Sequence, residues 1–306
     1  MEFRKSLCFA LADLMRKDDK ICILDADLSK PNGTQPLYKE FPDRCFNVGI
    51  AEANMIGVAA GLAAYGYKPV VFSFTPFATR RVCDQIAVSV AYAKQKITII
   101  GTDPGITATL NGGTHMSFED IAVVRSIPNM VIFDAADSKQ LGDAIKELIE
   151  IDNPVYVRVP RKFDTSIYND DYKFELFKAD IVKSGKDVTI IASGIMVNEA
   201  LKAVELLKEE NVDVELINVN TIKPLDEKTI LDSVKKTNHV VVCDNHNVIG
   251  GLYSAVCELL CSKYPLKVGA VGVKDRFGQV GSYNDLLKDY SMTPLDICNT
   301  VKENLK

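Results

Sequence analysis

Apolar residues recur along the chain in short Val, Ile and Leu runs that alternate with longer amphipathic segments. Such runs are typical of strands buried on both faces of a sheet, and apolar positions spaced three or four apart are typical of helices. In the first half, strands are predicted at 20–28, 45–50, 69–74, 97–102, 130–135 and 154–159, and helices within 1–20 and at 51–65, 78–94, 118–126 and 139–150. This alternation predicts a doubly wound α/β domain with a parallel sheet.

The second half repeats the pattern after a mixed polar and aromatic segment at 163–178. Its predicted strands are 187–193, 213–219, 239–245 and 267–273, and its predicted helices are 198–210, 227–236 and 250–262. We therefore predict two doubly wound domains, 1–162 and 181–306, joined by a linker at 163–180. Gly250 and Gly251 open a helix directly after a strand and loop, where they could seat an anion or allow close helix packing. A lone glycine pair favours packing.

Composition and charge narrow the function classes. The chain has 306 residues, 47% of them hydrophobic, and a formal net charge of −5, which indicates a globular protein without a basic surface for nucleic acid or an anionic membrane. Residues 1–20 lack the apolar core of a signal peptide, and the cysteines show no CxxC spacing. We expect a cytoplasmic protein whose partners are small molecules or proteins.

Residues 47–66, NVGIAEANMIGVAAGLAAYG, form the most unusual segment. A helix made almost entirely of Ala, Gly and aliphatic residues is expected to be buried on all sides, and its small residues suit a subunit interface. Glu52 lies in its first turn. The helix dipole explains such a carboxylate, and periodicity alone favours that interpretation. An apolar surround also suits a group that shares a proton with a polar partner.

Several segments together resemble one known family. They are FNVGIAEANMIGVAAGLA, SFTPF with a downstream RRVCDQI, VELINVNTIKPLD and IGGLYSAV. The sequence resembles the transketolase group of thiamine-diphosphate enzymes over essentially its whole length, in particular the C-terminal half that some organisms encode as a separate subunit. The resemblance implies a pyrimidine-binding domain, a transketolase C-terminal domain, and transfer of a two-carbon ketol unit from a ketose to an aldose.

The resemblance also implies a partner subunit. In that family a GDG…N motif of an N-terminal domain holds the diphosphate and Mg²⁺, and this sequence has no such motif. We therefore expect thiamine diphosphate to be shared with an N-terminal partner, Mg²⁺ to be bound by that partner, and no metal ligands in this chain. The expected assembly is α2β2 with self-association of this chain, which is inactive alone.

For the cofactor, the resemblance assigns Glu52 to the aminopyrimidine ring nitrogen, where it stabilises the imino tautomer that removes the thiazolium proton. A carboxyl group in a dry pocket suits this task. Phe74 and Phe77 match aromatic residues that pack on the pyrimidine, with core packing as the alternative. Leu28, after Asp27 in DADL, matches the residue that supports the bent cofactor, and an ordinary strand end is the alternative.

For the substrate, Arg4 and Arg161 match phosphate-clamping arginines, and forked guanidinium groups suit a terminal oxyanion. The alternative for both is solvated surface arginine. His115 in GGTH matches a histidine near the reacting carbon, with a loop contact as the alternative. No role is assigned to His239 or His246.

Three positions depart from the family pattern. Asn111 or Gly112 stands where an Asp usually recognises the hydroxyl configuration, Pro31 stands at or near a phosphate-binding Ser, and Thr102 replaces a phosphate-binding His. Losing two of four phosphate donors weakens binding of a phosphorylated sugar by a few kcal/mol if nothing compensates. A ketose that ends in a sulfonate, or in a free or branched end, is therefore an open hypothesis.

Two other functions remain open from the sequence. One is a different enzyme with the same cofactor, either 1-deoxyxylulose-5-phosphate synthase or the β subunit of a 2-oxoacid dehydrogenase. The IAEAN context and IKPLD favour transketolase over both. The other is a non-catalytic nucleotide-binding or scaffolding α/β protein, in which Glu52 only begins a helix.

Overall fold

The computed structural model describes residues 1–306. They form two compact units that alternate along the chain. The first unit comprises Met1–Pro104 and Val123–Leu176, and the second comprises Gly105–Ala122 and Phe177–Lys306. The consecutive domain boundaries expected from the sequence stay a prediction, and each unit is described separately.

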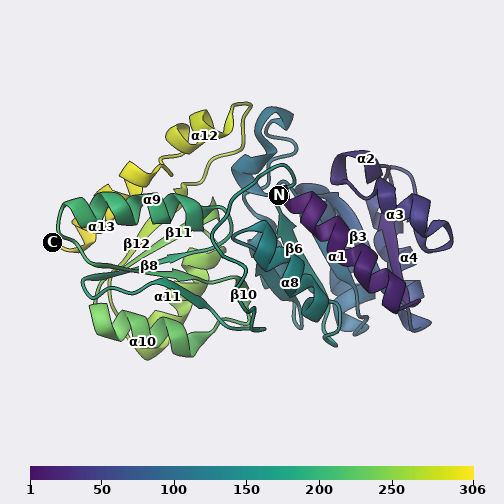
Figure 1. Cartoon of the computed structure of the whole chain (residues 1–306), viewed down its shortest axis with the longest axis horizontal. Helices are drawn as coiled ribbons and strands as arrows, with labels where there is room; N and C mark the ends of the chain where they lie inside the picture. The colour runs from purple at the N-terminus through teal and green to yellow at the C-terminus, as the bar shows by residue number, and fades with distance from the viewer. The chain divides into compact units, whose positions relative to one another are not determined.

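The first unit contains a parallel sheet of buried strands (Figure 1). Its strands are β1 (Ile21–Asp25), β2 (Cys45–Asn47), β3 (Lys68–Phe74), β4 (Thr98–Thr102), β5 (Val131–Asp134) and β6 (Val155–Val159). Their order is β5-β6-β4-β3-β1-β2, and every neighbouring pair is parallel. The predicted doubly wound α/β class is confirmed, and the carboxyl ends of these strands meet at one edge of the sheet.

Helices flank this sheet. They are α1 (Phe3–Lys17), α2 (Ser29–Asn32), α3 (Gln35–Glu40), α4 (Glu52–Ala64), α5 (Thr75–Ala78), α6 (Cys83–Gln85) and α8 (Ser138–Leu148), with the short 3₁₀ turns η1 (Pro42–Arg44) and η2 (Arg80–Val82) and the π-helix η3 (Ile86–Tyr92). Helices α1 and α8 lie side by side (Figure 1). Helix α7 (Asp120–Arg125) lies where the chain passes from the second unit to the first.

The single helix predicted at 78–94 is wrong. The backbone leaves helical geometry at Thr79, with φ −130° and ψ −82°, and continues as η2, α6 and η3. The Thr79 hydroxyl donates to the carbonyl of Thr75 at 2.7 Å, a local bond of the kind that competes with regular helix geometry. This break determines the position of Arg81, described below.

Helix α4 is not buried on all sides in this chain, so that expectation is also wrong. Its buried residues are Glu52, Met55, Ile56 and Ala59, which share one face because they are spaced three or four apart. The opposite face carries small residues with open space beyond them. A Cβ added at Gly57 or Gly61 would meet no atom within 4 Å.

The second unit contains a five-stranded sheet in the order β12-β11-β8-β9-β7. The strands are β7 (Asp180–Lys183), β8 (Val188–Ala192), β9 (Val214–Asn218), β11 (Val240–Asn247) and β12 (Val268–Val273), and only β7 is antiparallel. The remaining elements are α9 (Met196–Glu209), β10 (Thr221–Lys223), α10 (Glu227–Thr237), α11 (Leu252–Lys263), α12 (Tyr283–Asp289), α13 (Pro294–Asn304) and η4 (Gly105–Asn111). Helices α9 and α13 cover one face, and α10 and α11 the other (Figure 1). The second α/β domain is thus confirmed.

Gly250 and Gly251 serve close packing, as favoured from the sequence. A Cβ at Gly250 would lie 2.4 Å from the Cβ of Ala122, and a Cβ at Gly251 would lie 2.3 Å from an oxygen of Asp244. That Asp244 oxygen also accepts a hydrogen bond from the Leu252 amide at 2.7 Å. The amide at the start of α11 therefore already has a carboxylate partner from the same chain.

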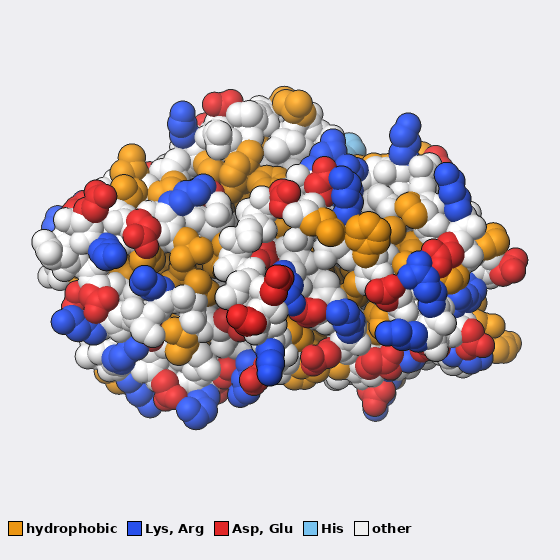
Figure 2. Space-filling model, in the orientation of Figure 1, with side chains coloured by type: hydrophobic (Ala, Val, Ile, Leu, Met, Phe, Trp, Pro, Cys, Tyr) orange, Lys and Arg blue, Asp and Glu red, His pale blue; other side chains and the backbone are white.

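Acidic and basic side chains are interspersed over the face drawn in Figure 2, with apolar side chains among them. All eight cysteines are free thiols, and five of them are buried: Cys8, Cys22, Cys45, Cys243 and Cys298. None of the helices combines the length and the apolar character that crossing a bilayer requires.

Candidate active site

Most of the candidate residues follow the carboxyl ends of strands in the first unit. Leu28 comes after β1, Phe74 ends β3, and Arg161 comes after β6. Ligands of open parallel sheets bind at this edge, where loops from several strands converge. The sheet therefore brings together side chains that are far apart in the sequence.

Glu52 begins helix α4 and is almost fully buried. Its carboxylate is not in a purely apolar setting, because Nη1 of Arg81 donates to both Oε1 and Oε2 at 3.0 Å. The Arg81 guanidinium also lies over the Phe77 ring, 3.9 Å from its centroid. Glu52 thus has a polar partner from η2 of the same chain, and its expected proton-sharing contact with the cofactor stays a prediction.

Phe74 and Phe77 form an edge-to-face pair with ring centroids 6.3 Å apart. Both rings are only partly buried, so they are not ordinary core residues. The guanidinium of Arg161 lies over the Phe74 ring, 4.7 Å from its centroid. Each ring of the SFTPF segment therefore carries one arginine, Arg81 on Phe77 and Arg161 on Phe74.

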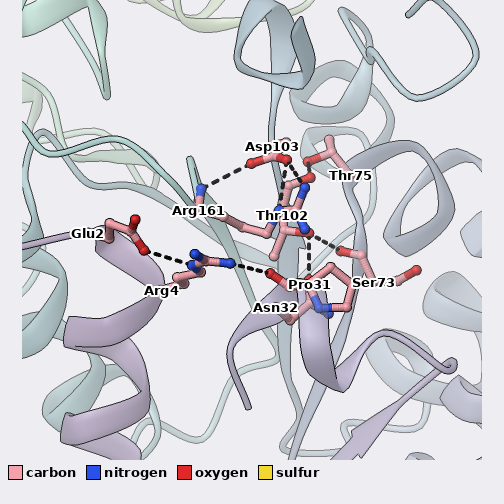
Figure 3. A network of polar contacts seen from close by, with 9 residues as sticks. All are labelled: Glu2, Arg4, Pro31, Asn32, Ser73, Thr75, Thr102, Asp103 and Arg161. Atoms are coloured by element: carbon pink, nitrogen blue, oxygen red, sulfur yellow. Dashed lines mark hydrogen bonds and ion pairs between the residues drawn. The ribbon is translucent and has the colours of Figure 1, made fainter. Parts of the chain in front are cut away.

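Arg161 is buried and paired with Asp103 (Figure 3). Oδ2 of Asp103 accepts from Nε of Arg161 at 2.8 Å and from Nη2, and Oδ1 accepts from the Arg161 amide at 3.0 Å. Asp103 follows β4 and has a positive φ of 54°, a conformation that Asp tolerates better than most residues. Its amide donates to the carbonyl of Val159 at 2.9 Å, which fixes this turn to β6.

Arg4 lies close to Arg161, since its amide donates to the Arg161 carbonyl at 3.2 Å. The Arg4 guanidinium is also occupied. Nε donates to Glu2 at 2.9 Å and Nη1 to the Pro31 carbonyl at 3.2 Å (Figure 3). The hydrogen bond from Arg4 holds the pKa of Glu2 below its ordinary value. Both candidate arginines therefore already bind a carboxylate of this chain.

Thr102, which the sequence places at a substrate-binding position, is buried in β4. Its hydroxyl donates to the Asn32 side chain at 3.1 Å and to the Ser73 carbonyl at 3.2 Å, and its carbonyl accepts from Thr75 at 2.9 Å (Figure 3). The side chain beside Arg161 is that of the next residue, Asp103.

The loop after β1 is held by Asp25. This buried carboxylate accepts from the Leu28 amide at 3.0 Å and from the Tyr38 hydroxyl at 2.8 Å. Burial raises the pKa of Asp25 above its ordinary value, and the Tyr38 hydrogen bond opposes that shift. Asp27 has a positive φ of 61° and is bonded to Asn47, which leaves Leu28 half-buried at the end of the strand.

Asn111 and His115 belong to the second unit. Asn111 is exposed at the end of η4, and Nδ1 of the half-buried His115 lies 2.9 Å from the Thr114 hydroxyl. His246, without a predicted role, is buried, with Nδ1 2.7 Å from the Asn247 carbonyl and Nε2 3.9 Å from Asp120. His246 is therefore part of the packed interior of the second unit.

Comparisons with known proteins identify the family. The transketolase pyrimidine-binding domain model matches residues 1–163, and the transketolase C-terminal domain model matches residues 177–297. The chain belongs to the transketolase family. It is 46% identical to the 6-deoxy-6-sulfo-D-fructose transketolase subunit SqwH of a Clostridium species, over 96% of this chain and 91% of that protein.

Two further members of the transketolase family match this chain over nearly the full length of both proteins. A subunit of the apulose-4-phosphate transketolase of Phocaeicola vulgatus is 33% identical over 99% of this chain and 97% of that protein. A solved structure described as a split gene transketolase, inactive beta4 tetramer, is 38% identical, with a TM-score of 0.91 and coverage of 100% of this chain and 98% of that one. This chain is thus a transketolase subunit in a two-chain enzyme, as the sequence predicted.

The alternatives are less well supported. The 1-deoxy-D-xylulose-5-phosphate synthases match at 31–33% identity over 45–48% of their own length. Family membership also favours an enzyme over a scaffold in which Glu52 only begins a helix.

Transketolases depend on thiamine diphosphate, and the residues around Glu52 fit its aminopyrimidine end. A planar group with N–H donors, the Arg81 guanidinium, already lies on Phe77 and donates to both Glu52 oxygens. An aminopyrimidine has the same planarity and also has a ring nitrogen that can share a proton. The donor set therefore suits that ring.

Sequence reasoning missed Arg81, Asp103 and Asp25. The sequence predicts one continuous helix at 78–94, and the break at Thr79 that precedes Arg81 has no signal in the periodicity. Asp103 was one position from the residue selected, and the strand end at Thr102 was the signal that could have found it. Asp25 sits at a strand end two residues before Asp27, where a buried carboxylate commonly holds a loop.

Proposed function

We propose that this chain provides the aminopyrimidine side of a thiamine-diphosphate site, and that a partner subunit provides the diphosphate and Mg²⁺ side. The observation that carries the proposal is the buried Glu52 carboxylate, which accepts from a planar donor stacked on Phe77. When bound, thiamine diphosphate supplies the carbon nucleophile that breaks the C2–C3 bond of a ketose.

The residues of this chain have distinct tasks in that site. Glu52 shares a proton with a ring nitrogen, and its burial keeps water from competing for the carboxylate. Phe74 and Phe77 offer partly exposed rings for stacking. Asp25 holds the Leu28 amide, so that Leu28 supports the cofactor from a fixed loop. Asp27, bonded to Asn47, fixes the same loop.

For the substrate, we infer a ketose donor that ends in a sulfonate, with Arg4 and Arg161 near that end. His115 and Asn111 stay predicted contacts of the sugar hydroxyls. Two facts support this donor class. The relative SqwH is named for 6-deoxy-6-sulfo-D-fructose. In this chain both arginines are already partly neutralised by carboxylates, an arrangement poorly suited to a phosphate dianion.

For the assembly, we infer an α2β2 enzyme in which this chain contacts both its own copy and an N-terminal partner. Exposed apolar side chains lie on neighbouring elements α4 and η3, namely Val58, Val88 and Tyr92. Exposed apolar side chains on neighbouring elements are typical of a protein interface. The split gene transketolase neighbour is described as a beta4 tetramer, which supports self-association of this type of chain.

Co-purification from native cells, followed by a donor screen, tests the proposal. We expect this chain to be inactive alone and to require the co-purified partner, thiamine diphosphate and Mg²⁺ for turnover of 6-deoxy-6-sulfofructose with an aldose acceptor. Fructose 6-phosphate and xylulose 5-phosphate serve as comparison donors, and pyruvate with glyceraldehyde 3-phosphate tests the synthase alternative. Turnover without thiamine diphosphate would contradict the proposal. So would an enzyme that accepts pyruvate as its donor and none of the ketoses.

A further inference from the structure

A fixed negative charge lies within the pair of arginines at the carboxyl edge of the first sheet. The Asp103 carboxylate fills the Nε and Nη2 edge of the Arg161 guanidinium, and its other oxygen accepts from the Arg161 amide. The two N–H groups of Nη1 and the second N–H of Nη2 are left for an incoming anion. An anion that binds there therefore lies beside a carboxylate.

The position of this carboxylate is strongly constrained. Both side chains of the pair are less than one-tenth exposed. The Asp103 amide bonds to Val159, which links the ends of β4 and β6, and the Phe74 ring covers one face of the Arg161 guanidinium. Because the pair is buried and its backbone is bonded to β6, we expect Asp103 to keep its position when a ligand arrives.

The neighbouring arginine is balanced in the same way. Arg4 donates to Glu2 and to the Pro31 carbonyl (Figure 3). The two arginines and two carboxylates together carry no net charge. Lys5, whose Nζ lies 3.8 Å from Glu2, and Lys162 also act on the Glu2 carboxylate, and both lysines are exposed, so solvent screens them.

We propose that Asp103 is a specificity-determining residue that selects a donor ending in a single negative charge, such as a sulfonate, over a phosphate dianion. This inference rests on the proposed function, since it places the donor terminus near Arg4 and Arg161.

The physical basis is a difference in ligand charge. A phosphate monoester carries a charge near −2 at neutral pH, with a second pKa of about 6, whereas a sulfonate carries a single charge. Nη1 of Arg161 can attract either group. The buried Asp103 carboxylate repels the dianion more strongly, in a region where water screens charges poorly. Specificity of this kind depends on a repulsive element as well as an attractive one.

The test compares two donors in the enzyme co-purified with its partner. We expect Asp103→Asn to lower the ratio of kcat/KM for 6-deoxy-6-sulfofructose to kcat/KM for fructose 6-phosphate by about tenfold, because the repulsion of the phosphate is removed. Asn keeps the shape of the side chain and tolerates the positive φ.

Asp134→Asn is the matched control. Asp134 in β5 and Arg158 in β6 form another buried pair in the same unit, with Oδ2 and Nη1 2.8 Å apart. Its loss is expected to lower stability without changing the donor ratio. An unchanged ratio in a folded Asp103→Asn enzyme, or an equal change in the Asp134→Asn enzyme, would overturn the inference.

A measurement on the wild-type enzyme covers the case in which Asp103→Asn does not fold. As the pH falls from about 8 to 5.5, kcat/KM for the phosphate donor should rise relative to kcat/KM for the sulfonate donor, because the phosphate becomes a monoanion. A ratio that does not vary with pH would contradict the role of Asp103.

3-Hydroxypyruvate, which has no distal anion, separates the proposed role of Asp103 from the proposed function. If the enzyme turns over 3-hydroxypyruvate but does not discriminate between the sulfonate and phosphate donors, the role of Asp103 is wrong and the proposed function stands. If it turns over none of the donors, the proposed function itself is contradicted.

Discussion

Two carboxylate–arginine pairs lie on the two rings of the SFTPF segment, and they differ in how firmly they are closed. In the pair on Phe77, Glu52 is 4% exposed but Arg81 is 48% exposed and donates through a single nitrogen. In the pair on Phe74, Arg161 and Asp103 are 6% and 8% exposed and share three hydrogen bonds. The first pair can open toward solvent, and the second cannot.

The difference suggests separate roles for similar chemistry. The exposed Arg81 side chain can leave Glu52 because water replaces the hydrogen bonds that its guanidinium gives up. The carboxylate is then available to another planar donor. A buried pair resists separation because an uncompensated charge would remain in the interior. We therefore expect Asp103 to stay paired with Arg161, and Arg81 to exchange with another partner of Glu52.

The largest expected effect comes from removing the Glu52 charge. Glu52→Gln keeps the shape of the side chain but cannot share a proton, so turnover of the reconstituted enzyme should fall by about 100-fold or more. Steady-state kinetics with 3-hydroxypyruvate measures this loss, and thermal melting checks the fold.

Glu199→Gln is the matched control for this variant. Glu199 is another buried carboxylate in the first turn of a helix, α9, and it pairs with Lys202 at 2.8 Å. If burial at a helix start were all that mattered, both variants would lose the same activity. Wild-type turnover in the Glu52→Gln enzyme would refute the assigned role.

The next comparison concerns stability. Arg161→Met should lower the free energy of unfolding by about 3–5 kcal/mol, since the buried Asp103 charge loses its partner. Arg81→Met should cost about 1 kcal/mol or less, because Arg81 is half exposed. Met retains most of the apolar stem in both variants. Urea unfolding measures both values, and equal losses would mean that the two pairs are not different in kind.

The features that could be predicted are those that leave a local pattern in the sequence, whereas contacts between distant residues leave none. The parallel sheets were predictable because buried strands give continuous apolar runs, and Glu52 stood out as a charge on an apolar helix. The Glu52–Arg81 contact was not predictable, because it depends on a backbone break at Thr79 that has no signal in the hydrophobic periodicity. Asp103 was missed because its partner, Arg161, is distant in sequence and adjacent only through the pairing of β4 with β6.

A third carboxylate, Asp25, sharpens the comparison because a hydroxyl and an amide bind it rather than an arginine. Burial raises its pKa in the folded protein. A raised pKa means that the folded state binds the proton more tightly than the unfolded state. The resulting stabilisation is complete below the unfolded value of about 3.9 and is lost as the pH rises through the folded value.

Asp25→Asn should remove this dependence and produce the smallest effect of the set. Its free energy of unfolding relative to wild type should rise by about 1 kcal/mol or less between pH 4 and 8, because the amide is never ionised. Denaturant titrations across that range provide the measurement. A relative stability that falls as the pH rises would show that the ionised Asp25 is favoured in the folded state. In that case the hydrogen bonds from Leu28 and Tyr38 would outweigh burial, and Asp25 would resemble the arginine-paired carboxylates after all.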